Sequence, residues 1–189
     1  TAKVWDAKPG AALLTLDGHD GFVQSAAFSA DGTRIVTGSS DRTAKVWDAK
    51  TGAALLTLEG HGDAVLSAAF SADGTRIVTG SRDRTAKVWD AKTGAALLTL
   101  EGHGGFVLSA AFSADGTRIV TGSLDRTARV WDAKIGAALL TLEGHNGSVG
   151  SAAFSADGTR IVTGSDDGTA KVWDVKTGAA LLTLEGHNG

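Results

Sequence analysis

The sequence has 189 residues, a net charge of −3, a pI of about 5.9 and a mean hydropathy of +0.03. It contains no Cys, which excludes disulfides, thiolate zinc sites and cysteine nucleophiles. Its negative charge argues against a surface that neutralises nucleic-acid phosphates, and no apolar run approaches the roughly 20 residues of a membrane helix. The 26 glycines and the single proline favour short strands joined by tight turns.

A repeat of 42 residues runs through the chain. The hexapeptide T-A-K-V-W-D begins at Thr1, Thr43, Thr85 and Thr169, and T-A-R-V-W-D begins at Thr127. Four repeats account for 168 residues and leave 21, which is half a unit. Self-similarity at a fixed period indicates an architecture of stacked units. We predict one repeat domain over residues 1–189, divided into a half unit at 1–18 and repeats at 19–60, 61–102, 103–144 and 145–186.

Each complete unit is predicted to contain four strands. The half unit comes first and supplies one hairpin within residues 1–16. In the first complete unit the strands are expected at 22–29, 33–39, 43–47 and 53–58, and Asp31-Gly32 marks the first hairpin turn. Short strands with a turn signal every 8–12 residues are typical of an antiparallel all-β fold.

A single four-stranded unit cannot bury both of its apolar faces, so the units must stack on one another. Small residues such as Ala26, Ala27 and Ala44 permit close approach of neighbouring sheets. A ring of such sheets is a β-propeller, here with four complete blades and an N-terminal half-blade.

Three motifs recur in register: the Gly-His dipeptide, the S-x-D-x-T turn and the Trp-Asp pair. Together they resemble the WD-repeat (Trp-Asp repeat) β-propeller family, over the whole chain. The near identity of the units also resembles the recently amplified propellers of some bacteria. The resemblance implies a buried structural tetrad of His, Thr, Asp and Trp in each repeat. The matching residues are His19, Thr37, Asp41 and Trp47; His61, Thr79, Asp83 and Trp89; His103, Thr121, Asp125 and Trp131; and His145, Thr163, Asp167 and Trp173.

An open arc of four blades exposes two apolar faces. Two chains could cover them by closing an eight- or nine-bladed ring as a homodimer. One chain could instead close a tight four-bladed ring, or further repeats of a longer chain could complete the propeller. We favour the homodimer, because a two-fold dimer is the commonest closed oligomer.

Catalytic and metal-binding interpretations are weaker than structural ones. The repeated His residues could suggest a ring of metals, but four of the five have a matching Asp and Trp. The turns at Asp31, Asp73, Asp115 and Asp157 offer one carboxylate each, whereas calcium needs six to eight oxygen ligands. A catalytic triad needs one asymmetric set of residues, whereas the His residues and most Ser and Asp residues here recur from repeat to repeat. We therefore expect no enzyme, no metal and no cofactor.

The repeats differ mainly in two places, the loop before the first strand of each unit and the turn between its second and third strands. Both lie at the same end of an up-and-down blade, which we call the variable end. Random drift of tolerant loop positions is one explanation, and recognition of a partner is the other. The candidate partner-binding residues are Phe22, Gln24, Arg42, Leu66, Arg82, Arg84, Phe106, Leu108, Leu124 and Arg126.

The function that we expect is a non-catalytic scaffold that presents the variable end to protein or peptide partners, with acidic peptides favoured by the arginines. The alternative is a self-assembling building block, or an excerpt of a longer repeat protein, with no ligand of its own. No nucleic-acid or membrane partner is expected, and we expect a cytoplasmic location.

Overall fold

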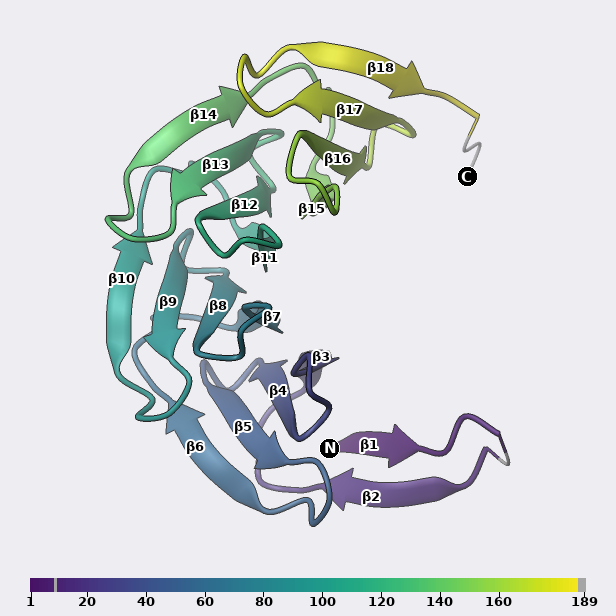
Figure 1. Cartoon of the computed structure of the whole chain (residues 1–189), viewed down its shortest axis with the longest axis vertical. Helices are drawn as coiled ribbons and strands as arrows, with labels where there is room; N and C mark the ends of the chain where they lie inside the picture. The colour runs from purple at the N-terminus through teal and green to yellow at the C-terminus, as the bar shows by residue number, and fades with distance from the viewer. Residues whose placement is uncertain (9, 187–189) are drawn as a thin grey trace.

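The computed structural model describes residues 1–8 and 10–186, and within them every regular element is a β-strand. Four antiparallel four-stranded sheets and one two-stranded sheet follow each other along an open arc (Figure 1). This confirms the predicted all-β fold of four blades and an N-terminal half-blade. Consecutive strands pair within each sheet, and the first strand of every blade lies on the inner side of the arc.

The strands group into blades as follows. The half-blade contains β1 (Ala2–Trp5) and β2 (Ala12–Leu16). Blade 1 contains β3 (Val23–Phe28), β4 (Arg34–Ser39), β5 (Ala44–Asp48) and β6 (Ala54–Leu58). Blade 2 contains β7 (Val65–Phe70), β8 (Arg76–Ser81), β9 (Ala86–Asp90) and β10 (Ala96–Leu100). Blade 3 contains β11 (Val107–Phe112), β12 (Arg118–Ser123), β13 (Ala128–Asp132) and β14 (Ala138–Leu142). Blade 4 contains β15 (Val149–Phe154), β16 (Arg160–Ser165), β17 (Ala170–Asp174) and β18 (Ala180–Leu184).

The hairpin turn between β3 and β4 is stabilised by residues within the turn itself. Gly32 adopts a φ of 69°, which a residue with a side chain rarely adopts. The carboxylate of Asp31 accepts hydrogen bonds from the Ser29 hydroxyl at 2.6 Å and the Thr33 backbone N–H at 3.0 Å. Because Ser29 is part of this turn, β3 ends one residue before the predicted boundary.

Neighbouring blades are held together by apolar side chains of their facing sheets. Val36, Val46 and Leu58 of blade 1 form one buried cluster with Ile77 and Trp89 of blade 2. Equivalent clusters join blade 2 to blade 3 and blade 3 to blade 4. The blades approach so closely that a Cβ added to Gly38 would lie 2.8 Å from Val65 Cγ1. Glycine is therefore required at this position in the sheet.

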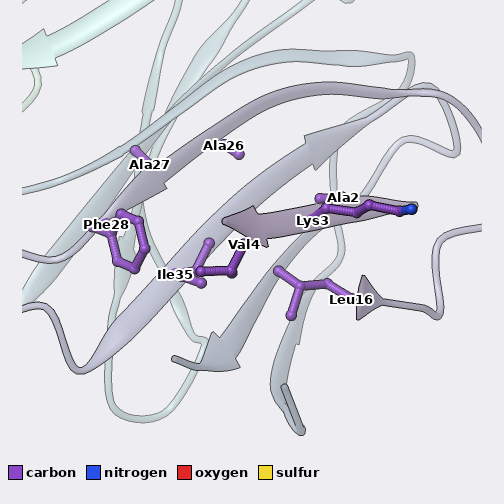
Figure 2. Close-up of a pocket in the computed structure, with 8 residues that line it drawn as sticks. All are labelled: Ala2, Lys3, Val4, Leu16, Ala26, Ala27, Phe28 and Ile35. Atoms are coloured by element: carbon purple, nitrogen blue, oxygen red, sulfur yellow. The ribbon is translucent and has the colours of Figure 1, made fainter. Parts of the chain in front are cut away.

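The two ends of the arc are covered to different extents. At the N-terminal end, Leu16 of the half-blade forms a buried cluster with Ile35 and Trp47 of blade 1. A groove remains between β1 and the first two strands of blade 1 (Figure 2). At the C-terminal end, Leu182 and Leu184 of blade 4 are 55% and 50% exposed. The C-terminal end of the arc thus exposes an apolar sheet face, whereas the half-blade partly covers the face of blade 1 at the N-terminal end.

Candidate functional site

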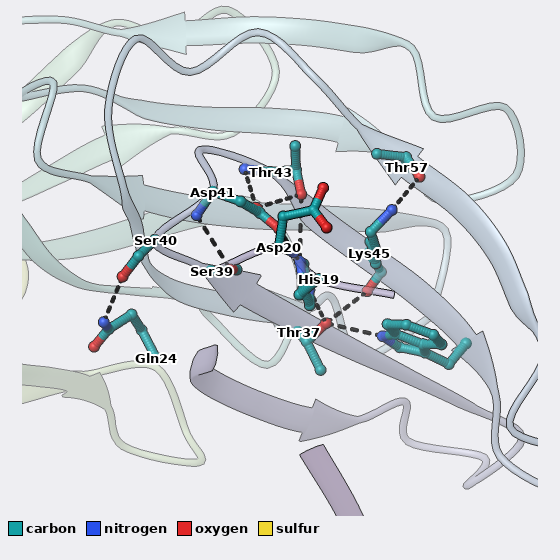
Figure 3. A network of polar contacts seen from close by, with 11 residues as sticks. His19, Asp20, Gln24, Thr37, Ser39, Ser40, Asp41, Thr43, Lys45 and Thr57 are labelled. Carbon is teal, nitrogen blue, oxygen red and sulfur yellow. Dashed lines mark hydrogen bonds and ion pairs between the residues drawn. The ribbon is translucent and has the colours of Figure 1, made fainter. Parts of the chain in front are cut away.

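The structure brings His19, Thr37, Asp41 and Trp47 together in one polar network (Figure 3). The Nδ1 atom of His19 lies 2.7 Å from Asp41 Oδ2, and its Nε2 atom lies 2.7 Å from Thr37 Oγ1. The indole Nε1 of Trp47 donates to the same Thr37 oxygen at 2.8 Å. These contacts fit a neutral imidazole that donates from Nδ1 to Asp41 and accepts the Thr37 hydroxyl at Nε2.

The same network recurs in the other three blades. There the distances from His Nδ1 to Asp Oδ2 are 2.7, 2.8 and 2.9 Å. The imidazoles are 1% exposed, and their ring centroids lie 6.0 Å from those of the tryptophans. Because both nitrogens of each ring are engaged, these histidines hold no free nitrogen for a metal or a proton transfer. The residues are His61, Thr79, Asp83 and Trp89; His103, Thr121, Asp125 and Trp131; and His145, Thr163, Asp167 and Trp173.

The aspartate of each network joins the loop to the turn at the variable end. In blade 2, Asp83 Oδ1 accepts from the backbone N–H and the hydroxyl of Thr85, and Oδ2 accepts from the backbone N–H of Gly62 at 2.9 Å. Burial raises the pKa of Asp83, but hydrogen bonds from Thr85 and His61 outweigh it and lower the pKa to about 2. Burial lowers the pKa of His61, although Asp83 partly opposes this. The pair is therefore a carboxylate beside a neutral imidazole.

In each of these blades the variable loop and the variable turn are joined by a backbone hydrogen bond. The backbone N–H of Ser40 donates to the carbonyl of Phe22 at 2.8 Å, and that of Leu124 donates to Phe106 at 2.9 Å. The side chains of Phe22, Phe106 and Leu124 are 83%, 37% and 45% exposed. Three of the apolar candidates thus lie at the predicted end of the blades and face solvent.

One contact at the variable end crosses from blade to blade. The guanidinium of Arg82, in the turn of blade 2, lies over the ring of Phe106 in the loop of blade 3, 5.9 Å from its centroid. Both side chains are exposed. The pair joins a cation and an aromatic ring in a single surface feature.

Gln24, Leu66 and Leu108 occupy a different place from the other candidates. They belong to β3, β7 and β11, which line the concave side of the arc (Figure 1). Gln24 Nε2 donates to Ser40 Oγ at 2.7 Å (Figure 3), whereas Leu66 and Leu108 are half-buried. The candidate surface therefore continues from the variable end onto the inner strands.

Three arginines at the variable end adopt an unusual backbone conformation. Arg42, Arg84 and Arg126 each have a φ of 71°, and the equivalent Gly168 has a φ of 79°. A non-glycine residue in this region costs roughly 1–2 kcal/mol. These arginines were predicted at the variable end, but their backbone strain was not. The signal that could have revealed it is the glycine at the same position of the last repeat.

A second set of arginines was missed because it is identical in every repeat. Arg34 donates from Nη1 to the carbonyl of Ala91 at 3.0 Å and from Nη2 to that of Gly74 at 2.6 Å. Both acceptors lie in the next blade, and the guanidinium lies 5.0 Å from the ring centroid of Phe70. Arg76 and Arg118 likewise donate to carbonyls of the following blade, so these three arginines each clamp one blade to the next.

Across residues 1–8 and 10–186, no three His, Asp or Glu side chains form a group that could hold a metal ion. In the same part of the chain, no helix is long and apolar enough to cross a membrane.

Comparisons with known proteins identify the repeat. The family model described as WD domain, G-beta repeat matches at residues 10–48, 52–90, 94–132 and 136–174. A comparison with curated proteins gave no match. Each matched segment contains one Trp-Asp pair and ends with it, at Asp48, Asp90, Asp132 and Asp174. The chain therefore belongs to the WD40 family of β-propeller repeat proteins.

Proposed function

We propose that the chain is a non-catalytic scaffold that presents its variable end to a protein or peptide partner. WD40 repeats generally mediate protein interactions, and the family is generally non-catalytic. The tetrads have a supporting role in this proposal, because they fix the loops and turns that carry the variable side chains. The single observation that carries it is the exposed Arg82–Phe106 pair, which spans two blades at the end where the repeats differ.

The chemistry of the variable end favours an acidic partner with an apolar side chain. Arg42, Arg84 and Arg126 lie at the same position of three successive blades, and Arg82 adds a fourth cation. Exposed Asp20 and Asp166 lie at the same end of blades 1 and 4, so the excess of positive charge is confined to blades 2 and 3, where the exposed Asp63 offsets only part of it. Aromatic and arginine side chains are the commonest energetic anchors of protein interfaces, and Phe22, Phe106 and Leu124 supply the apolar component. The overall charge of −3 does not favour nucleic acid.

A displayed library of acidic peptides that contain an aromatic residue tests this proposal. The wild-type chain is expected to enrich a consistent set of peptides, and the double variant Arg82→Ala/Leu124→Ala is expected to lose them. The matched control, Lys134→Ala/Ile135→Ala, removes a cation and an exposed aliphatic side chain from the opposite end of blade 3. If the Arg82/Leu124 variant enriched the same peptides as the wild type, the proposed binding face would be wrong.

We also propose that two copies pair to close one propeller of eight or nine blades. The supporting observation is the exposure of Val162, Leu182 and Leu184, whose equivalents in blades 1 to 3 are covered by the following blade. The same observation favours the second candidate function, a self-assembling building block without a ligand. A pairing chain that enriches no peptide would support the building block. The cytoplasmic location expected from the sequence stays a prediction.

A further inference from the structure

The half-blade and the second half of blade 4 have almost the same sequence. Residues 1–16 and 169–184 differ only by Ala7 in place of Val175 and by Pro9 in place of Thr177. Both segments form a hairpin with the same pairing, which places Ala2 opposite Leu16 and Ala170 opposite Leu184. A surface that accepts one of these hairpins therefore also accepts the other.

The half-blade covers only part of the face that blade 1 presents. It buries Ile35 and Trp47, which are 3% and 1% exposed. Ala26 and Phe28, on the innermost strand, stay exposed, and Phe28 is 56% exposed. Their equivalents in blade 2 are covered by a complete blade, and Ala68 is only 5% exposed there. The uncovered part of blade 1 is the place where two further strands pack in the internal interfaces.

The outer face of blade 4 is not covered by a following blade. Val162 is 44% exposed, whereas Val36, Val78 and Val120 at the same position are fully buried. Arg160 occupies the position of Arg34 and is exposed, and its guanidinium makes no hydrogen bond to the residues that the structure describes. The acceptors that match those of Arg34 are the carbonyls of Gly32 and Ala49, in blade 1. The ring that matches Phe70 is Phe28.

The exposed face of blade 4 and the partly covered face of blade 1 are complementary, because equivalent residues already pack together in the three interfaces between blades of one chain. We infer that the half-blade is a placeholder for β17–β18 of a second copy. In this exchange, which rests on the proposed pairing of two chains, blade 4 of one copy displaces β1–β2 from blade 1 of the other. Two exchanges related by a two-fold axis close a ring of eight blades, with both half-blades released from it.

The contacts explain why the larger element replaces the smaller one. A complete blade brings four strands to the face of blade 1, whereas the half-blade brings two. The additional strands cover Ala26 and Phe28, which the half-blade leaves exposed beside its groove (Figure 2). Arg160 gains two carbonyl acceptors and an aromatic ring. The exchange exposes Val4 and Leu16 but buries Val162, Leu182 and Leu184, so more apolar surface leaves water than enters it.

The arrangement also makes pairing adjustable. A docked half-blade occupies the site that the second copy needs, so the apparent Kd of pairing rises as the hairpin binds more firmly to its own chain. A substitution that loosens the hairpin is therefore expected to strengthen pairing. If the half-blade were instead a lasting part of the ring, the same substitution would weaken pairing.

Sedimentation equilibrium of the 189-residue chain, over a range of concentrations, tests the exchange. The expected species has twice the mass of the 19.1 kDa chain. Leu16→Asp, which loosens the half-blade, is expected to lower the Kd about tenfold. Deletion of residues 1–17 removes the half-blade altogether and is expected to act in the same direction, which provides a second variant if Leu16→Asp affects folding.

Arg160→Ala tests the docked geometry. It is expected to raise the Kd about a hundredfold or more, because hydrogen bonds from a charged donor are lost at both junctions of the two-fold ring. Arg82→Ala removes the same charge from the variable end and is expected to leave the Kd unchanged. Combining Arg160→Ala with Phe28→Ala is expected to cost less than the sum of the two single effects, because the two side chains would be in contact.

The outcomes separate the exchange from the pairing itself. A dimer that Leu16→Asp weakens, or that Arg160→Ala leaves unchanged, would overturn the exchange and leave a paired ring that contains the half-blades. A chain that stays monomeric, or that grows into long polymers, would overturn both proposals. None of these results bears on the peptide-binding face, which is tested by capture alone.

Discussion

The guanidinium of Arg76 in blade 2 donates a hydrogen bond to the backbone carbonyl of Gly116 in blade 3, at 2.6 Å. A second bond from Nη1 reaches the carbonyl of Ala133 at 3.1 Å, and the Phe112 ring lies beneath the guanidinium with its centroid 5.0 Å away. The arginine thus holds two backbone segments of the neighbouring blade that are distant in sequence.

This contact predicts unequal effects for the same substitution in different blades. Arg76→Ala is expected to lower the free energy of unfolding by about 1.5–3 kcal/mol, because hydrogen bonds from a charged donor to buried carbonyls are lost. Arg160→Ala is expected to change it by less than about 0.5 kcal/mol in the single chain, since Arg160 lies on an exposed face. Urea unfolding at a concentration where the chain is monomeric measures both. Equal losses in the two variants would contradict the clamp.

The tetrads predict a stability cost for a nearly isosteric change. Thr79→Val keeps the shape of the side chain but leaves the indole N–H of Trp89 without its acceptor and His61 without its donor. We expect the free energy of unfolding to fall by about 1–3 kcal/mol. Thr99→Val is the matched control, because Thr99 is an exposed strand residue whose hydroxyl meets only Lys87. A control that lost as much stability as the Thr79 variant would show that the buried network adds nothing.

The shifted pKa values predict two stages of acid destabilisation. Burial holds the pKa of His61 and His103 below the ordinary 6.5, so the unfolded chain takes up protons first and stability falls as the pH drops below that value. The pKa of Asp83 and of Asp125 is lowered from 3.8 to about 2, so a second loss is expected between these two values.

Urea midpoints measured from about pH 8 down to about pH 2 would follow both stages, because this range begins above the ordinary pKa of His and reaches the lowered pKa of the aspartates. The midpoint is expected to be constant above about pH 7.5 and to fall on acidification. A midpoint that rises as the pH drops from 7 to 5 would contradict the assignment of neutral histidines.

The positive φ of three arginines predicts that glycine is easier to accommodate there. Arg126→Gly is expected to leave the free energy of unfolding unchanged or to raise it by up to about 1 kcal/mol, because relief of strain offsets the greater freedom of the unfolded chain. The reverse change, Gly168→Arg, is expected to lower it by about 1 kcal/mol. If Arg126→Gly also weakened peptide capture, stability and binding would favour different residues at one position. A marked loss of stability in Arg126→Gly would show that its side chain makes a stabilising contact.

The sequence analysis predicted the blades because hairpin turns and strand alternation depend on residues that are close together in the chain. The residues of the polar networks, such as His19, Asp41 and Trp47, were indicated by the resemblance to the WD-repeat family. The contact of Arg34 with Gly74 could not be found in this way. It depends on how far one blade leans over the next, and a residue that never varies between repeats gives no signal when the repeats are compared.

The burial of identical residues likewise cannot be predicted from the residues around them in the sequence. Val36 and Val162 occupy the same position of the same repeat, yet one is fully buried and the other is 44% exposed. Their difference arises only from whether another blade follows. The strain at Arg42 was missed for another reason: its sequence signal is Gly168, at the same position of the last repeat, and not any residue adjacent to Arg42.

The interfaces between blades are copies of one another, and this has a consequence for how such a chain can change in length. Gaining or losing one whole 42-residue unit by recombination would create no junction that the protein does not already contain. A change in the number of blades would therefore require no new blade–blade interface. Selection on such a change would act on the diameter of the closed ring, because the packing between blades stays the same.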